Sequence, residues 1–209
     1  MTEIKIGKML IGSVQTNCYF LYREDQKEVI CIDPADQGEQ IYQKLLSQGF
    51  TIKAILLTHG HFDHIFGCDV IKEKTNAPIY ALKQEKELLG NATQNVSIQF
   101  GRPYTLNADY YFEDGESITI AGMNVRVIAT PGHTAGSCCF YLEEVGMLIS
   151  GDTLFEESVG RTDLPTGSGA QLARSVKEKL FILPEETKVY PGHGDATTIG
   201  HEKQYNPFF

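Results

Sequence analysis

The run His59-Gly60-His61-Phe62-Asp63-His64 places four side chains that can bind a metal ion within six residues. The glycine between the first two histidines lets the backbone turn, so that both imidazoles can face a common ion. Asp63 and His64 follow at the expected start of a helix and approach from a slightly different position. Because a structural role alone explains this spacing poorly, we interpret the run as part of a metal site.

Short apolar runs, typical of strands, end directly in ligand-capable residues at four places along the chain. They are Ala54-Ile55-Leu56-Leu57 before Thr58-His59, Val125 to Ala129 before Thr130-Pro131-Gly132-His133, Met147-Leu148-Ile149 before Ser150-Gly151-Asp152, and Lys188-Val189-Tyr190 before Pro191-Gly192-His193. Each later motif alone is typical of a turn, but strand ends in a layered fold can converge on one rim. With His133, Asp152 and His193 the chain offers seven ligands, which suit two divalent ions that share one carboxylate.

The composition is that of an ordinary globular protein. Its 209 residues are 42% hydrophobic and 22% charged, and we expect a single domain over residues 1–209. The net charge of −9, without a basic run, disfavours nucleic acid as a partner. The sequence shows neither a secretory signal at its amino terminus nor an apolar stretch that could cross a membrane, so we expect no membrane association.

The cysteines and the last histidine carry no comparable signal. Five cysteines, an odd number with no Cys-x-x-Cys pair, indicate neither a disulfide framework nor a thiolate zinc site, and a reducing cytoplasm is the simplest location. Cys138 and Cys139 are neighbours in an expected strand, where they should point to opposite faces. His201 lies beside Glu202 without a ligand context, and we interpret it as a solvated residue.

The pattern of apolar and turn residues predicts two blocks of strands, each followed by helix. Expected strands cover residues 4–11, 19–23, 29–32, 54–57, 117–120, 124–129, 137–142, 147–150 and 187–190. Expected helices cover residues 40–48, 63–74 and 169–181, with a helical turn near Gly200, whereas residues 91–109 show no clear pattern. This order predicts an α/β (α+β) protein with packed sheets and helices outside.

These motifs resemble those of the metallo-β-lactamase superfamily over essentially the whole chain. The motifs that carry the resemblance are Thr58-His59-Gly60-His61-Phe62-Asp63-His64, Thr130-Pro131-Gly132-His133-Thr134, Gly151-Asp152-Thr153-Leu154-Phe155 and Pro191-Gly192-His193-Gly194. Within the superfamily the chain is most similar to the glyoxalase II group, hydroxyacylglutathione hydrolases that cleave a thioester. The resemblance implies an αββα sandwich of the metallo-β-lactamase type.

The resemblance also implies a division of the ligands between two ions. One ion would be held by His59, His61 and His133, the other by Asp63, His64 and His193, with Asp152 bridging them. Asp33, in Ile32-Asp33-Pro34, matches a family position that supports a ligand from behind, and its alternative role is a turn or helix cap.

Two features separate the chain from full-length glyoxalase II. That enzyme has a carboxy-terminal helical region that helps to hold glutathione, and here only a short tail ending Asn206-Pro207-Phe208-Phe209 follows the last ligand. The segment Val159 to Pro165 resembles short glyoxalase II-like bacterial proteins, and Arg161 falls near the position where the longer enzymes place a cationic substrate contact. Arg161 can bind a substrate carboxylate or pair with Asp163 to brace its loop, and we favour the bracing role.

We expect hydrolysis of a small-molecule thioester such as a hydroxyacylglutathione by a metal-bridging hydroxide, with no separate catalytic side chain. We expect two divalent ions, with zinc preferred and iron or manganese as alternatives. The first alternative is a persulfide dioxygenase, which shares the Gly-Arg-Thr-Asp segment and would hold one iron through His59, His133 and Asp152. The second is a metal-binding module without turnover. A β-lactamase and a ribonuclease are disfavoured, and no oligomeric state is predicted.

Overall fold

The computed structural model describes residues 2–209, which form two six-stranded sheets and a small ribbon. The first sheet has the order β1 (Ile4–Ile11), β2 (Thr16–Arg23), β3 (Glu28–Ile32), β4 (Thr51–Leu56), β5 (Ile79–Leu82) and β6 (Tyr110–Phe112). The second has the order β14 (Thr197–Thr198), β13 (Lys188–Pro191), β10 (Met147–Gly151), β9 (Cys138–Leu142), β8 (Met123–Ala129) and β7 (Ser117–Ile120). The ribbon pairs β11 (Leu154–Phe155) with β12 (Ser158–Val159).

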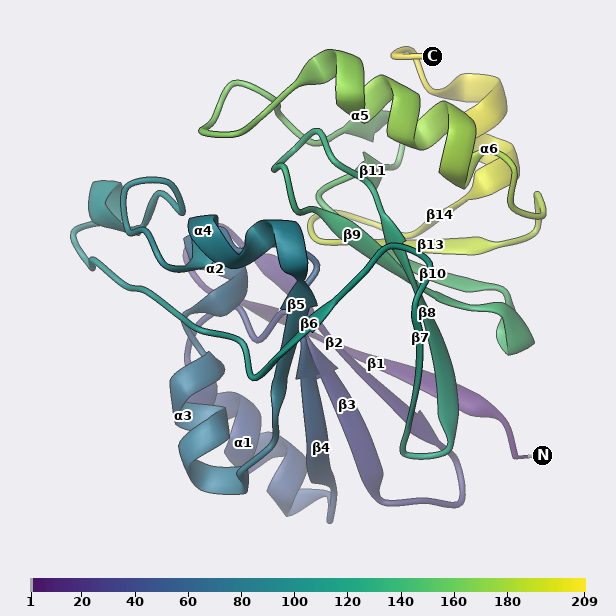
Figure 1. Cartoon of the computed structure of the whole chain (residues 1–209). Coiled ribbons are helices and arrows are strands. Elements are labelled where there is room, and N and C mark those ends of the chain that lie inside the picture. The colour runs from purple at the N-terminus through teal and green to yellow at the C-terminus, as the bar shows by residue number, and fades with distance from the viewer. Residues whose placement is uncertain (1) are drawn as a thin grey trace.

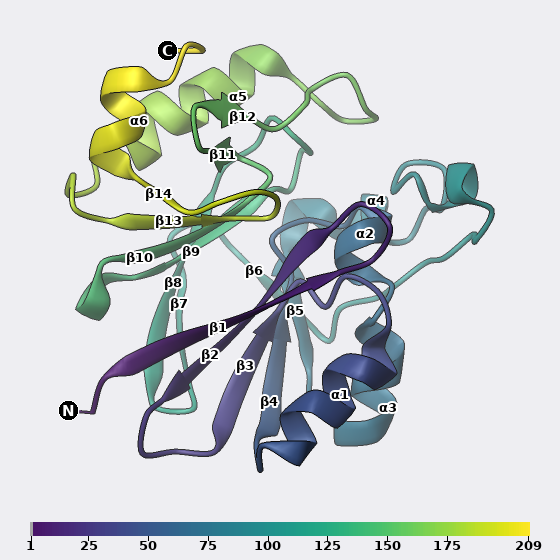
Figure 2. The ribbon, with the colours of Figure 1, turned by 180° about the vertical axis from the view of Figure 1, so that it is seen from behind.

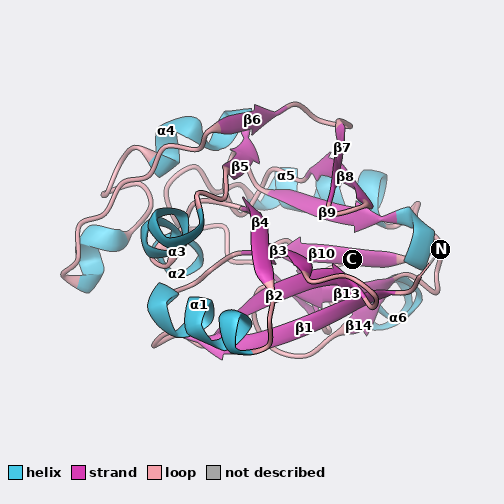
Figure 3. Cartoon of the chain, turned by 90° about the horizontal axis from the view of Figure 1, so that it is seen from below, coloured by secondary structure: helices cyan, strands magenta, loops and turns pink. Residues whose placement is uncertain are grey.

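Helices cover the outer face of each sheet (Figures 1 and 2). The amino-terminal half contains α1 (Gly38–Ser47), α2 (Phe62–Ile65), α3 (Cys68–Thr75), η1 (Lys83–Glu85), α4 (Lys86–Leu89) and η2 (Ser97–Phe100). The carboxy-terminal half contains η3 (Glu143–Val145), α5 (Gly169–Ser175), the π-helical turn η4 (Val176–Leu180) and α6 (Ile199–Tyr205). Seen from below, α1 and α3 lie together on one side of the strands (Figure 3). The αββα sandwich is confirmed.

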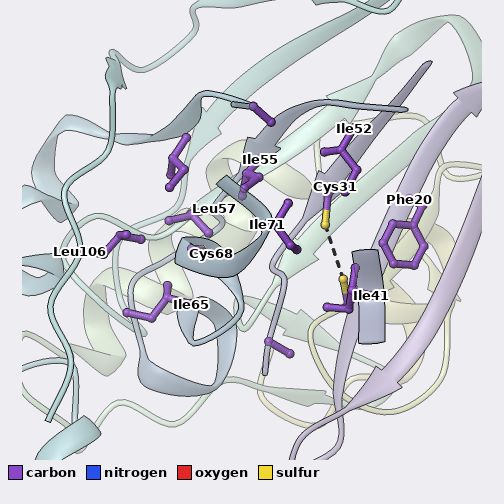
Figure 4. Close-up of a cluster of buried hydrophobic side chains, with 14 of the residues drawn as sticks. Phe20, Cys31, Ile41, Ile52, Ile55, Leu57, Ile65, Cys68, Ile71 and Leu106 are labelled. Atoms are coloured by element: carbon purple, nitrogen blue, oxygen red, sulfur yellow. Dashed lines mark hydrogen bonds between the residues drawn. The ribbon is translucent and has the colours of Figure 1, made fainter. Parts of the chain in front are cut away.

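Alternation along the strands divides the first sheet between two apolar layers. Tyr19 and Leu21 of β2 enter the layer between the sheets, whereas Cys18 and Phe20 face α1 and α3. Figure 4 shows the helix-facing cluster, in which Ile41 of α1 lies close to side chains of the sheet. Because successive side chains of a strand point to opposite faces, both faces of this sheet are buried.

The second sheet shows the same alternation. Cys138 and Phe140 of β9 belong to the layer between the sheets, and Cys139 and Tyr141 pack beneath the helices of the carboxy-terminal half. The expectation that Cys138 and Cys139 point to opposite faces is therefore confirmed. Complete burial of a residue such as Phe140 stabilises the fold by about 1.5–3 kcal/mol.

The expected helix over residues 63–74 is wrong as a single element, because Phe66 and Gly67 separate α2 from α3. A Cβ atom at Gly67 would collide with the carbonyl oxygen of Pro34, and Gly67 N donates to Ala35 O at 3.2 Å. Tertiary contact with the loop after β3 therefore ends the first helical segment. The short α2 carries residues of the His59 to His64 run, while α3 packs against α1.

All of the expected strands are present, with ends displaced by at most three residues. Strand β5, helix α4 and strand β6 were not predicted. The run Ile79–Leu82 is short and buried, and a short apolar run of this kind does not distinguish strand from helix. Within residues 2–209, we find no helix of the length and apolar character needed to cross a membrane.

Candidate metal centre

The candidate ligands lie at the carboxyl ends of strands from both sheets. His59 follows β4, His133 follows β8, Asp152 follows β10 and His193 follows β13. A backbone hydrogen bond of 2.8 Å from Cys138 N to Thr58 O joins the two sheets beside the site. The structure therefore brings residues that are distant in sequence to one place between rigid elements.

Three histidines form the first group. His61 Nδ1 lies 2.8 Å from His133 Nε2, which in turn lies 3.2 Å from His59 Nε2. All three side chains are buried. Their ligand atoms are close enough to one another to bind one common ion.

The second group consists of Asp63, His64 and His193. Asp63 Oδ2 lies 3.2 Å from His193 Nε2 and 3.4 Å from His64 Nε2. Asp152 lies between the two groups, with Oδ1 3.5 Å from His64 Nε2 and Oδ2 3.6 Å from His133 Nε2. The seven residues singled out in the sequence thus converge, and the structure places His201 elsewhere, 3.1 Å from Glu157 Oε1.

Three buried atoms of the cluster fit the binding of positive ions. Among residues 2–209, His61 Nε2, His64 Nε2 and Asp152 Oδ1 have no hydrogen-bond partner, although a buried polar atom without a partner is costly. All three atoms belong to residues of the candidate ligand set. Imidazole nitrogens and carboxylate oxygens together suit zinc, iron or manganese, so these residues fit a pair of divalent ions.

The electrostatics of the two groups differ. Burial, reinforced by the neighbouring His133, lowers the pKa of His61 to about 3, which keeps this imidazole neutral and able to bind a metal. Burial also opposes protonation of His64, but Asp63, Asp152 and Asp33 outweigh it and raise the pKa of His64 to about 10. The carboxylates of the second group therefore favour a positive charge at this place.

Asp33 orients the second group from behind. Its Oδ2 accepts hydrogen bonds from His64 Nδ1 at 2.9 Å and from Thr58 Oγ1 at 2.6 Å, and Oδ1 accepts one from Thr58 N at 2.8 Å. Asp33 is buried and has a φ of 48°, a conformation that few residues other than glycine adopt. The alternative of a helix cap does not fit, because the residue before α1 is Gln37.

Residues from other loops fix further candidate ligands. His133 Nδ1 donates to the carbonyl oxygen of Arg161 at 2.7 Å, and Thr16 Oγ1 donates to Asp63 Oδ2 at 3.0 Å. Partners of this kind set the orientation and tautomer of a metal-binding histidine. Thr16 lies at the start of β2 and has no sequence motif that would have identified it.

Glu85 is the most substantial contributor that the sequence did not reveal. Its buried carboxylate accepts hydrogen bonds from Gly60 N at 2.7 Å and Thr134 Oγ1 at 2.9 Å. Gly60 separates His59 from His61, and Thr134 follows His133, so Glu85 ties together the two loops of the first group. Burial raises the pKa of Glu85 to about 7. A buried acid between Gln84 and Lys86 has no signal in the sequence.

Two glycines make the close packing of the site possible. Gly151 has a φ of 49°, and a Cβ atom there would collide with the side chain of Thr58. A Cβ atom at Gly192 would collide with Asp152 Oδ1 and lie 2.8 Å from His64 Cε1. The glycines in the Ser-Gly-Asp and Pro-Gly-His motifs are therefore needed for the approach of the ligands and not only for turns.

A cavity of about 530 Å³ opens onto the cluster. It is lined by Val14, His61, Phe62, Asp63, Val96, Gln99, Phe100, His133, Asp152, Phe155, Ser158, Val159, Arg161, Leu164 and His193. Arg161 forms a bidentate pair with Asp163, with both nitrogen–oxygen distances 2.7 Å. This pairing agrees with the bracing role favoured from the sequence, and Arg161 also lines the cavity.

An αββα sandwich with a histidine and aspartate cluster at its strand ends is an arrangement suited to a metal-dependent enzyme. A model of the metallo-β-lactamase superfamily matches residues 11–193, and the chain belongs to this superfamily. The chain is 40% identical over 207 residues to "Probable metallo-hydrolase YqgX" of Bacillus subtilis, covering 98% of this chain and 97% of that protein. It is 32% identical over 201 residues to "Hydroxyacylglutathione hydrolase GloC" of Haemophilus influenzae, covering 95% and 94%.

Solved structures show the same fold. BLEG-1 B3 metallo-β-lactamase superposes with a TM-score of 0.93 at 40% identity, covering 98% of this chain and 99% of that chain. TTHA1623 in a di-iron-bound form gives a TM-score of 0.86 at 33% identity, covering 97% and 100%. ETHE1 from Myxococcus xanthus gives 0.81 at 28% identity, covering 97% and 83%.

Proposed function

We propose that this protein is a dinuclear metal hydrolase that cleaves a small thioester, such as a hydroxyacylglutathione, with water into a carboxylic acid and a thiol. The observation that carries the proposal is the position of Asp152 between the two groups. Its Oδ2 lies 3.6 Å from His133 Nε2 and 3.5 Å from His193 Nε2. The likeness to a relative described as a hydroxyacylglutathione hydrolase supports a thioester as the substrate.

The proposed ligand sets follow the geometry. One ion would be held by His59, His61 and His133, and the other by Asp63, His64 and His193. Asp152 would contribute to both. A pair of divalent ions, when bound, lowers the pKa of a shared water and stabilises the negative charge that develops on the carbonyl oxygen. We propose zinc, with iron or manganese as alternatives, and the likeness to a di-iron-bound structure supports iron. A reducing cytoplasm, the proposed location, suits the five free cysteines.

The lining of the cavity supports a leaving group that needs no proton donor. Apart from the candidate ligands, Arg161 is the one ionisable side chain that we find on the cavity wall within residues 2–209. A thiol with a pKa of roughly 8.5 leaves as thiolate without much acid assistance, whereas an amine or alkoxide leaves poorly without a proton. The role of the chain's own residues is therefore to hold the ions and orient the acyl group. We assign no side chain as a proton donor to the leaving thiolate.

The alternative of a persulfide dioxygenase keeps specific support. His59, His133 and Asp152 would supply the two histidines and one carboxylate of a single-iron site, because His133 Nε2 lies 3.2 Å from His59 Nε2 and 3.6 Å from Asp152 Oδ2. The chain is also similar to ETHE1 at 28% identity. A metal-binding module without turnover is less well supported, because five of the seven candidate ligands line an open cavity of about 530 Å³.

A substrate panel tests the proposal. The purified, metal-loaded protein is given S-lactoylglutathione and other thioesters, a β-lactam and glutathione persulfide, and thiol release, ring opening and oxygen uptake are measured. Thiol release well above the rate without enzyme, and above the rate of an Asp152→Ala variant, supports the hydrolase. Oxygen uptake without thiol release supports the dioxygenase instead, ring opening alone would favour a β-lactamase, and no turnover of any compound would favour the binding module.

A further inference from the structure

Part of the cavity wall beside the candidate metal centre is strongly apolar. We call Phe62, Val96 and Phe100 the apolar wall. The rings of Phe62 and Phe100 stack with their centroids 3.9 Å apart, and Phe100 remains 51% exposed although it is a large aromatic residue. An exposed aromatic side chain on the wall of a cavity presents surface that a ligand can cover.

The apolar wall is held in place by hydrogen bonds of the buried residue Asn95. The carbonyl oxygen of Asn95 accepts a bond from Phe62 N at 3.0 Å, and Asn95 Nδ2 donates to Tyr104 O at 2.8 Å. The next residue, Val96, has a φ of 69°, a conformation that β-branched residues rarely adopt. A strained residue fixed by a buried neighbour indicates that the wall is formed before a ligand binds.

The cations near the apolar wall already have acidic partners. Arg161, on the cavity, is paired with Asp163. A smaller adjoining hollow of about 170 Å³ shares Phe62 and Phe100 with the cavity and contains Arg102, whose Nη1 donates to Asp36 Oδ1 at 2.9 Å. A free carboxylate on the substrate arm would have to displace an aspartate from either guanidinium.

We infer that the apolar wall binds an aliphatic or aromatic arm of the substrate, next to the carbonyl group that reacts at the metal centre. This inference rests on the proposed function for the identity of that carbonyl group. It favours thioesters that can place an uncharged, hydrophobic portion against the apolar wall, and the carboxylates of a glutathione arm would have to lie away from it. The arm can belong to the acyl side or the thiol side, because both flank the same carbonyl.

Binding of straight-chain carboxylates, from acetate to octanoate, tests the apolar wall without turnover. Calorimetry on the metal-loaded protein should show affinity rising about three- to fourfold for each of the first few added methylenes. In Phe100→Ala, the ratio of octanoate to acetate affinity should fall at least fivefold. Ile98→Ala is the matched control, because Ile98 is 49% exposed on the same turn but lines neither hollow, and its ratio should stay that of the wild type. Affinity that is independent of chain length, or equal ratios in the two variants, would overturn the inference.

Kinetics with two series of thioesters then shows whether the hydrophobic arm lies on the acyl side or the thiol side of the carbonyl. The same kinetics shows whether this inference or the proposed function has failed. One series lengthens the acyl group on a fixed small thiol, and a second lengthens the thiol on an acetyl group. The series whose kcat/KM rises with length, and loses that rise in Phe100→Ala, identifies the arm. If no thioester is cleaved but the octanoate preference depends on Phe100, the proposed function fails and the apolar wall stands. If thioesters are cleaved without a length effect in either series, the inference fails and the proposed function stands.

Discussion

The Asp33 carboxylate accepts a hydrogen bond from His64 Nδ1 at 2.9 Å, and the other nitrogen of the same ring faces Asp63 and Asp152. Nδ1 carries the proton of this bond, so in the neutral ring, which metal binding requires, Nε2 is the lone-pair nitrogen that would face a metal ion. The pairing selects the tautomer that metal binding needs. Asp33 therefore supports the second group without touching its ion.

Replacing Asp33 with Ala should lower the affinity for the ion proposed to bind Asp63, His64 and His193 by about 10- to 100-fold, as loss of such a supporting partner usually does. Competition with a chelator, followed by metal analysis, measures the effect. Asp36→Ala is the matched control, because Asp36 is the next acid along the loop and pairs with exposed Arg102 and the backbone N–H of Gln37 instead of with His64. Equal metal affinity in both variants would show that the hydrogen bond to His64 has no such role.

Gly192→Ala should abolish metal binding while the sheets stay folded. The added methyl group would collide with Asp152 Oδ1 and crowd His64 Cε1. Gly194→Ala offers a control in the same loop, since Gly194 has a φ of 75° and a Cβ there meets nothing within 4 Å. That control should lose about 1–2 kcal/mol of stability from its backbone conformation and keep its metal. Metal content and circular dichroism of the two variants decide the matter.

Glu85 should make folding stability depend on pH. Its pKa is raised by burial to about 7 in the folded chain, against 4.5 for an exposed glutamate, so folding takes up a proton between these pH values. The contribution is complete below about pH 4.5 and is lost as pH rises to about 7, with a total change of at most roughly 3 kcal/mol. Denaturant unfolding of the wild type and Glu85→Gln is measured from pH 4 to 8. As pH rises from about 4.5 to about 7, the free energy of unfolding of the wild type should fall relative to that of the variant.

Other titrating groups cancel in that comparison because both proteins contain them. Glu87→Gln, which changes an exposed acid on the next turn, serves as the control and should follow the wild-type curve. If the free energies of unfolding of the wild type and Glu85→Gln differed by the same amount at every pH, the Glu85 carboxyl would have the same pKa in the folded and unfolded chain, which would contradict the prediction.

Freeing Arg161 should alter substrate choice and leave the fold intact. Its partner Asp163 is 66% exposed and Arg161 itself 62%, and exposed ion pairs contribute little to stability. In Asp163→Ala the guanidinium is no longer paired, so thioesters with a carboxylate arm should show a lower KM, by roughly threefold to tenfold. Steady-state kinetics with matched neutral and carboxylate-bearing thioesters measures the change. An unchanged KM ratio would confine Arg161 to bracing its loop.

The longer strands and the ligand motifs could be predicted from the sequence because each is local. Alternating runs such as Ile4–Ile11 and the spacing from His59 to His64 are written in neighbouring residues. The break at Gly67 was missed because its cause, the carbonyl oxygen of Pro34, lies 33 residues earlier in the chain. Glu85 was missed for the same reason, since its partners Gly60 and Thr134 come from other loops.

Substitution of Asp152 tests the dinuclear arrangement, because this residue lies between the two groups of candidate ligands. Its replacement by Ala should remove the shared ligand and lower thioester hydrolysis on the order of 100-fold or more, beyond the usual effect of a supporting residue. Asp114→Ala, which removes an exposed carboxylate paired with Lys179, should keep full activity and controls for loss of charge. Full activity of Asp152→Ala with an intact fold would contradict the assignment of Asp152.

The most direct test of the central claim is a count of metal ions and a product assay on the same sample of protein purified from its own cell. We predict two transition-metal ions per chain, together with release of free thiol from a thioester and no oxygen uptake with glutathione persulfide. One iron per chain, with oxygen uptake and no thioester cleavage, would contradict the account.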